Sequence, residues 1–148
     1  RAGTPAQVFN TMVIDGDEYR IRLNGHVYHC ALDVTMELVG GKWKTIVLWY
    51  LRKDKKRFSE LRKLIPGITE KMLSLQLRQL EKDGFVSRKV YPEVPPRVEY
   101  ALTAHGRTLL PLLEEIAAWG RMMGKKYGSV EKVDRPAKKK AARKKVST

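Results

Sequence analysis

The chain has 148 residues, 43% hydrophobic and 31% charged, with a formal net charge of +14 and a pI of about 10.0. This apolar content can bury a core and excludes full disorder, while the excess of Lys and Arg predicts an anionic partner such as nucleic acid or a membrane surface. One cysteine excludes an intrachain disulfide framework and fits a reducing compartment, and no apolar stretch approaches the roughly 18 residues that span a bilayer.

The N-terminal part predicts one β-hairpin after an unpatterned leader over residues 1–10. Residues 12–14 and 19–23 are β-prone, and the Asp15-Gly16 pair between them is a hairpin turn signal. Asn24-Gly25 then predicts a second turn.

Short helices are predicted next, because apolar residues recur at helical spacing over residues 31–39 and 42–51, with Gly40-Gly41 between them. A polar run over residues 52–57 follows. A third helix opens at Phe58, with Ser59 as its predicted N-cap.

The fourth predicted helix is amphipathic. Pro66-Gly67 breaks the third helix, Thr69 caps the fourth, and Gly84 stops it after about Asp83. At 100° per residue, its apolar side holds Leu73, Gln76, Leu77 and Leu80, and its opposite side holds Lys71, Ser74, Leu75, Arg78 and Lys82.

Two strands and a long helix complete the predicted elements. Residues 85–91 and 97–102 alternate like strands, joined by a proline-rich tip that cannot continue a ladder. Thr103 caps a last helix of about 20 residues, which Pro111 is expected to bend. Beyond Gly128 the chain becomes a Lys/Ala-rich tail that we expect to be disordered; residues 131–148 carry a net charge of +6, which leaves +8 on residues 1–130.

A helix, a Pro-Gly turn, a helix with a cationic outer face and a two-stranded hairpin together predict a helix-turn-helix followed by a wing. A helix fits the DNA major groove, where base edges are distinguishable, and Arg or Lys can contact guanine or phosphates. Taken alone, a helix with a basic outer face is as often an ordinary solvent-exposed helix as a DNA-binding one. The turn, the wing and the basic body together favour DNA binding. The candidate DNA-binding residues are Ser59, Thr69, Lys71, Ser74, Leu75, Arg78, Lys82, Arg88, Lys89 and Arg97.

Many ordered motifs lie between residues 30 and 120: Cys30 ten residues before Gly40, Gly40-Gly41-Lys42-Trp43-Lys44, Arg57-Phe58-Ser59-Glu60-Leu61-Arg62, Pro66-Gly67-Ile68-Thr69, Met72-Leu73-Ser74, Leu77-Arg78-Gln79-Leu80-Glu81, Asp83-Gly84, Tyr91-Pro92-Glu93-Val94-Pro95-Pro96-Arg97-Val98-Glu99-Tyr100 and Leu102-Thr103-x-x-Gly106. Because of these motifs and their order, the chain resembles the HxlR-type winged-helix transcriptional regulators, which are relatives of the MarR group. The resemblance implies a bacterial or archaeal homodimer on palindromic operators, with the helix after Thr69 as recognition helix and Arg97 as wing arginine. Leu75 stands where family members commonly have a polar residue, and Ala31 where a proline usually follows the cysteine.

The same resemblance implies that Cys30 can sense oxidants or electrophiles, as it does in several family members. Cys30 immediately precedes a predicted helix, and the N-terminus of a helix favours a thiolate. With no second cysteine, the only protein disulfide available is between subunits; a small thiol, a sulfenic acid or alkylation would otherwise serve. The alternative is an inert buried thiol.

No metal site, cofactor or enzymatic activity is expected. His26, His29 and Cys30 are N and S ligands close in sequence, but no CxxC or HxxxH pair accompanies them. The chain has no phosphate loop, nucleophile elbow or carboxylate pair in an apolar context.

These observations predict a mainly α (α+β) protein: a winged helix-turn-helix with an extra N-terminal β-hairpin and a long C-terminal dimerisation helix. The predicted parts are residues 1–29 (leader and hairpin), 30–128 (DNA-binding and dimerisation) and 129–148 (tail). The terminal helix and the segment around Cys30 offer more apolar surface than one chain buries, which favours a homodimer, although the helix could instead only complete the monomer's core.

We therefore expect a cytoplasmic, nucleoid-associated regulator of transcription whose partners are double-stranded DNA, a second copy, and an oxidant or small-molecule effector, with no membrane partner. An architectural DNA-coating protein of little sequence preference is the first alternative, because the tail resembles the lysine-rich tails of nucleoid proteins. An RNA-binding winged helix is a second.

Overall fold

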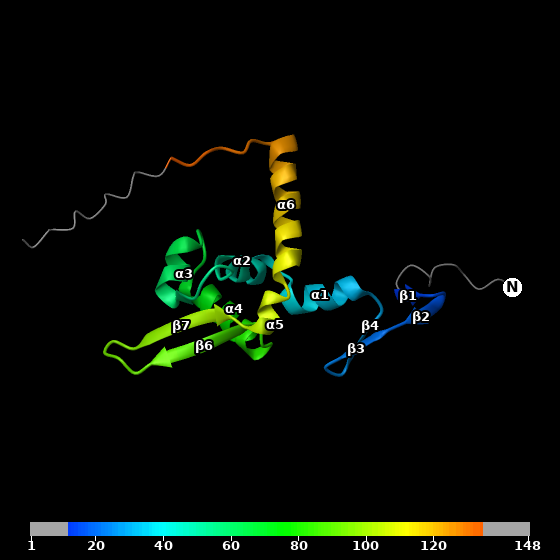
Figure 1. Ribbon diagram of the computed structural model, residues 1–148, viewed down its shortest axis with the longest axis horizontal. Coiled ribbons are helices and arrows are strands. Elements are labelled where there is room, and N and C mark those ends of the chain that lie inside the picture. Colours follow the sequence, from blue (N-terminus) through cyan, green and yellow to red (C-terminus); the bar gives the residue numbers. More distant parts are fainter. Residues whose placement is uncertain (1–11, 135–148) are drawn as a thin grey trace, which may run out of the picture. The chain divides into compact units, whose positions relative to one another are not determined.

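The computed structural model describes residues 12–134, and Figure 1 shows the order of its elements. The helices and strands, in chain order, are β1 (Met12–Ile14), β2 (Asp17–Tyr19), β3 (Ile21–Leu23), β4 (His26–Tyr28), α1 (Ala31–Val39), α2 (Lys42–Tyr50), β5 (Lys56–Arg57), α3 (Phe58–Leu64), α4 (Glu70–Lys82), β6 (Val86–Tyr91), β7 (Arg97–Leu102), α5 (Ala104–Arg107) and α6 (Leu110–Tyr127). The α+β class is confirmed. The chain to Glu114 forms one compact unit, and the chain from Glu115 onward forms another. The expected leader and most of the expected tail lie outside the described residues.

The N-terminal extension contains two β-hairpins, so the expectation of a single hairpin is wrong. β1 pairs with β2 across one turn, and β3 pairs with β4 across another. Both turns have two central residues with positive φ, which is the type I′ geometry that Asx-Gly pairs favour: Asp15 51°, Gly16 84°, Asn24 49° and Gly25 78°. The predicted strand over residues 19–23 is therefore divided at Arg20, because its two halves pair with different partners.

The core of the first unit lies between the helices and a three-stranded antiparallel sheet of order β5-β7-β6. α4 packs on α2 and β6, and α3 packs on α2 and β7. Leu73, Leu77 and Leu80 of α4 are each no more than 1% exposed, so the predicted apolar side of this helix is confirmed. Burying a leucine side chain stabilises a fold by about 2 kcal/mol, so this face anchors α4 firmly.

The N-termini of α3 and α4 are capped in different ways. Thr69 caps α4 as predicted, since its Oγ1 accepts a hydrogen bond from the Met72 N–H at 3.1 Å. The prediction of Ser59 as N-cap of α3 is wrong. The extended N-cap residue is Arg57, whose N–H donates to the Glu60 carboxylate at 3.3 Å, because the chain enters α3 directly from β5.

The predicted last helix is two helices, α5 and α6, rather than one bent helix. Thr103 caps α5, with its Oγ1 accepting from the Gly106 N–H at 3.0 Å. Pro111 is the second residue of α6, where a missing N–H costs no intrahelical bond. Had α5 continued, that N–H would have been needed for Arg107, so the helix ends there and a new one starts.

Helix α5 is held tightly against the start of β6. The Thr103 N–H donates to the Phe85 carbonyl at 3.1 Å, and the Thr103 hydroxyl donates to the Gly84 carbonyl at 2.6 Å. Gly106 is buried there, and a Cβ built on it would lie 2.1 Å from the Phe85 carbonyl oxygen. Only a residue without a side chain fits this contact.

Candidate nucleic-acid interface

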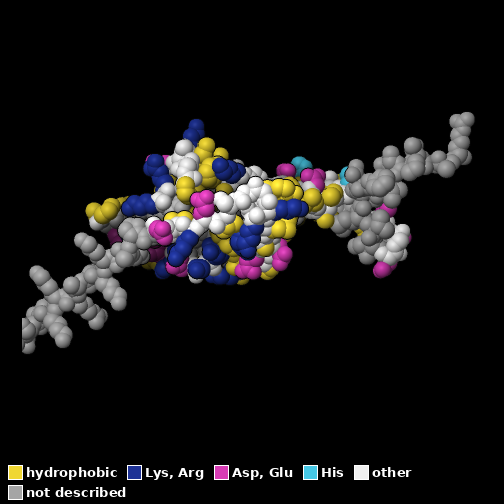
Figure 2. Space-filling model, turned by 90° about the horizontal axis from the view of Figure 1, so that it is seen from above, with side chains coloured by type: hydrophobic (Ala, Val, Ile, Leu, Met, Phe, Trp, Pro, Cys, Tyr) yellow, Lys and Arg dark blue, Asp and Glu magenta, His cyan; other side chains and the backbone are white. Residues whose placement is uncertain are grey.

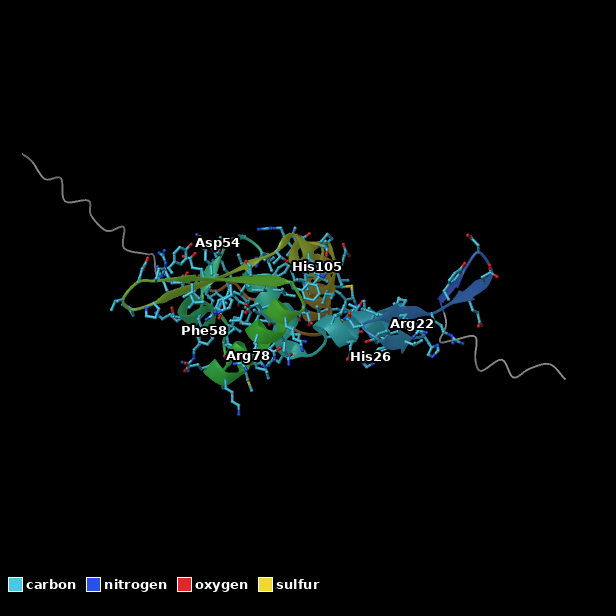
Figure 3. The ribbon with its side chains drawn as sticks, turned by 90° about the horizontal axis from the view of Figure 1, so that it is seen from below. Arg22, His26, Asp54, Phe58, Arg78 and His105 are labelled. Atoms are coloured by element: carbon cyan, nitrogen blue, oxygen red, sulfur yellow. The ribbon has the colours of Figure 1, made fainter. Side chains whose placement is uncertain are left out.

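Helix α4 presents a cationic, solvent-exposed face opposite its buried leucines. Lys71, Leu75, Arg78 and Lys82 are exposed, and Ser74 is half-buried. Arg78 is labelled beside α4 in Figure 3. Four of the predicted DNA-contacting side chains on this helix therefore share one accessible face, including the apolar Leu75, which is 46% exposed.

The first helix of the pair is joined to α4 by an ion pair. Arg62 Nη1 of α3 lies 3.3 Å from Glu70 Oε2 in the first turn of α4. Both side chains are exposed, so the pair stabilises the fold by no more than about 1 kcal/mol. Ser59 is exposed near it, in a shallow hollow of about 450 Å³. Thr69 is also exposed, with its oxygen already engaged in the cap of α4.

The register of the wing separates its three predicted basic residues onto two faces. Arg88 lies opposite the buried Tyr100 and so belongs to the face of the sheet that covers the core. Lys89 lies opposite Glu99, and Arg97 opposite Tyr91, so both belong to the outer face. The sequence placed all three together, whereas only Lys89 and Arg97 share a face.

Arg97 is held by its own neighbours. Its Nη2 lies 3.3 Å from Glu93 Oε1, its Nε lies 3.7 Å from Glu99 Oε1, and its guanidinium carbon lies 4.0 Å from the centre of the Tyr91 ring. Lys89 Nζ is 4.8 Å from the same ring. The arginine side chain is 27% exposed, so it is ordered by the wing itself.

Glu99 is the ionised centre of this arrangement. Burial by itself would raise the pKa of Glu99, but the neighbouring Lys55, Tyr91 and Arg97 favour the charged form, outweigh burial and lower the pKa below its ordinary value. Lys55 Nζ lies 3.2 Å from Glu99 Oε2. The carboxylate therefore stays charged at neutral pH and keeps its cations in place.

Sequence reasoning missed two cations of the same face, Lys55 and Arg57. Arg57 lies opposite Glu99 in the β5–β7 ladder, and Lys55 reaches Glu99 through its ion pair. We call Lys55, Arg57, Lys89 and Arg97 the wing-face cations. Their only sequence signal was the density of basic residues over 52–57. Figure 2 shows one side of the described body, on which basic side chains lie among acidic ones.

Cys30 is exposed and occupies the N-cap of α1, directly before the helix that the sequence predicted. Its carbonyl accepts from the Asp33 N–H at 3.1 Å, and its side chain makes no capping hydrogen bond. His26 lies beside Tyr28, with ring centres 6.4 Å apart. Within residues 12–134, no three His, Cys, Asp or Glu side chains gather as a metal-binding group.

Apolar side chains remain exposed on two helices outside the core. On α6, Leu112, Ile116 and Trp119 follow one another at helical spacing and are 40–61% exposed. On α1, Leu32 and Met36 are 63% and 51% exposed. Each helix, taken by itself, thus leaves an unpartnered apolar stripe. None of the helices within residues 12–134 combines the length and apolar character needed to cross a membrane.

Comparison with known proteins gives a family and named relatives. The family described as HxlR-like helix-turn-helix matches residues 38–127. An HTH-type transcriptional regulator of Bacillus subtilis (strain 168), YdeP, is 54% identical over 91 residues, which cover 62% of this chain and 71% of the relative. An HTH-type transcriptional regulator of Methanothermobacter thermautotrophicus is 50% identical over 97 residues, covering 66% of this chain and 74% of the relative.

Solved structures show the same similarity. The redox regulator HypR in its oxidised form is 49% identical with a TM-score of 0.60, covering 63% of this chain and 96% of that one. The reduced form of the transcriptional regulator YodB from B. subtilis is 35% identical with a TM-score of 0.55, covering 62% of this chain and 89% of that one.

Proposed function

Since the chain belongs to the HxlR-like helix-turn-helix family and is a transcriptional regulator of the HTH type, we propose that it acts as a homodimer on palindromic operators. The observation that supports this most is α4, which is anchored by three buried leucines and presents Lys71, Leu75 and Arg78 to solvent. A helix held rigidly on one face and free on the other is what entry into a major groove requires.

Each exposed residue of the interface has a role in this proposal. Arg78 contacts base edges, because a guanidinium can bond two acceptors of guanine, and Leu75 contacts a thymine methyl. The other candidates contact phosphates and set the register of the protein on the duplex; they are Ser59, Thr69, Lys71, Ser74, Lys82, Lys89 and Arg97. Arg88 lies on the core side of the wing, so it can contact DNA only along the outer edge of β6, the edge strand of the sheet.

The two copies of the proposed homodimer meet through the apolar stripes of α1 and α6. Leaving Ile116 and Trp119 in water is unfavourable, and a second copy of the same helix would cover both. A two-fold dimer would place two copies of α4 about 34 Å apart, one turn of DNA. The proposal includes the expected division of the chain into residues 1–29, 30–128 and 129–148, with the middle part responsible for DNA binding and dimerisation.

The effector is proposed to act on Cys30 or at the dimer interface. The exposed thiol at the start of α1 is accessible to an oxidant, and the solved relatives include a redox regulator, HypR, and a diamide-treated YodB. Oxidation would act through an intersubunit disulfide or a mixed disulfide with a small thiol. If Cys30→Ser leaves operator affinity as sensitive to diamide as before, the thiol is not the sensor.

The decisive experiment compares the affinity of the reduced protein for the DNA upstream of its own gene with that for a shuffled duplex, at near-physiological salt. A ratio of about 10³ or more supports a sequence-reading regulator of the bacterial or archaeal cytoplasm. A ratio near one, with affinity lost when residues 131–148 are removed, supports instead an architectural, nucleoid-coating protein. Preference for RNA competitor would favour the RNA-binding alternative.

A further inference from the structure

A shallow hollow of about 400 Å³ lies between the wing tip and the start of α3. Its polar lining consists of Arg57, Ser59, Glu93 and Arg97, and Phe58 and Val98 belong to its apolar lining. Within residues 12–134, Arg57 has no ion-pair partner. Two guanidiniums and a hydroxyl around an open hollow are donors suited to a phosphodiester, which accepts hydrogen bonds and carries one negative charge.

The two carboxylates that hold Arg97 are unequal. Glu99 is 12% exposed and is held in turn by Lys55, whereas Glu93 is 53% exposed and lies at the wing tip. An exposed ion pair is weak and easily exchanged, while a buried and doubly paired carboxylate is a fixed part of the fold. Glu93 is therefore the partner that a competing anion can replace.

The guanidinium of Arg97 is not saturated in the free protein. Its Nε is buried and makes no hydrogen bond within the described chain; it lies 3.7 Å from Glu99 Oε1, which is beyond hydrogen-bond distance. The ring of Tyr91 supports the guanidinium plane from one side. Because this Nε is buried, an anion in the hollow would bond to the terminal nitrogens of the guanidinium, of which Nη2 contacts the exposed Glu93.

We propose that this hollow binds a backbone phosphate of the duplex and that Glu93 occupies its arginine as an internal competitor until DNA displaces it. The proposal rests on the proposed DNA-binding function. Glu99 and Tyr91 act as positioning residues, which keep the guanidinium aimed at the hollow. Because the competition concerns a phosphate and no base, Glu93 lowers affinity for every duplex by the same factor and leaves sequence preference unchanged.

Binding of a fluorescent operator duplex and a shuffled duplex to the full-length protein tests this. Glu93→Gln should tighten binding to both by about three- to tenfold, and the ratio of the two affinities should not change. Glu93→Asp keeps the charge but shortens the reach to Arg97, so it should also tighten binding. If Glu93→Asp binds as the wild type does while Glu93→Gln binds more tightly, the effect is bulk charge and the proposal fails.

A double-mutant cycle with Arg97→Gln isolates the pair. In that background, Glu93→Gln should raise the affinity for either duplex by less than twofold. Arg97→Gln alone should reduce the slope of log affinity against log salt by about 0.9, which corresponds to the loss of one phosphate contact. If Glu93→Gln raises the affinity as much in the Arg97→Gln background as in the wild type, the proposal is overturned. Glu114→Gln, an exposed carboxylate on α6, is the matched control and should change affinity less than twofold. A wild-type protein that binds no duplex would refute the proposed function itself.

Discussion

Replacing Gly106 by alanine should destabilise the fold by about 3 kcal/mol. The new Cβ would lie 2.1 Å from the Phe85 carbonyl oxygen and 3.0 Å from its carbon, and both are backbone atoms that no side-chain rotation can move. Relief requires α5 to move away from β6, which strains the hydrogen bonds of Thr103 to Phe85 and Gly84. Overpacking costs about 1–3 kcal/mol, and a weakened hydrogen bond adds about 1 kcal/mol.

The same substitution at Gly120 should have the opposite sign. Gly120 lies inside α6, is exposed, and a Cβ there meets no atom within 4 Å. Alanine stabilises a helix interior by about 0.5–1 kcal/mol relative to glycine. At about 4 °C per kcal/mol for a domain of this size, Tm should fall by about 12 °C in Gly106→Ala and rise by about 2–4 °C in Gly120→Ala.

Thermal unfolding followed by far-UV circular dichroism measures both variants against the wild type. All samples need one protein concentration, because association makes Tm depend on concentration. If Gly106→Ala unfolds within about 0.5 kcal/mol of the wild type, the size of an ordinary surface substitution, the close approach of α5 to β6 is not a constraint. If both variants raise Tm, helix propensity and not steric overlap governs Gly106.

Four other changes test the interface, the dimer and the wing. Arg78→Ala should lower operator affinity by about 1–3 kcal/mol and reduce the operator-to-shuffled ratio, whereas Lys82→Ala should weaken both duplexes alike and reduce the salt slope by about 1, as binding assays over a salt series would show. Trp119→Asp should convert the protein to monomers in analytical ultracentrifugation without loss of circular dichroism, since this side chain is 61% exposed in the single chain. Glu99→Gln should destabilise the protein at neutral pH, because a carboxylate with a lowered pKa stabilises the fold above its ordinary pKa and loses that effect as pH falls through the lowered value. The difference in unfolding free energy between Glu99→Gln and the wild type should therefore vanish in acid; a difference that persists there would contradict the role of the charge.

Sequence signals predicted the helix-turn-helix and the wing well because they are local there. Thr69 and Gly84 mark the two ends of α4 within one turn of the helix, and the alternation of the wing strands is broken by prolines. The separation of α5 from α6 was missed for a different reason. Apolar spacing over residues 103–123 suits one helix or two, and only the register of Pro111 relative to Arg107 decides between them.

The candidate site was predicted residue by residue but not as a set of partners. Arg97 was identified as the wing arginine, yet the carboxylates that hold it lie at the wing tip and two residues along β7, and their geometry depends on the strand register. Arg57 was missed because β5 has two residues, too few for any periodic pattern. Both failures concern contacts between segments, which a single segment's composition does not encode.

The shortness of β5 also bears on the order of folding. It pairs with β7 at Lys56 and Arg57, more than forty residues along the chain, and the intervening loop contains α3, α4 and β6. Closing so long a loop for so few hydrogen bonds is entropically unfavourable unless the enclosed segment is already compact. The helix pair and the β6–β7 hairpin should therefore form before β5 is captured. In native-state hydrogen exchange, the β5 amides should open more readily than those of α4, which stays folded.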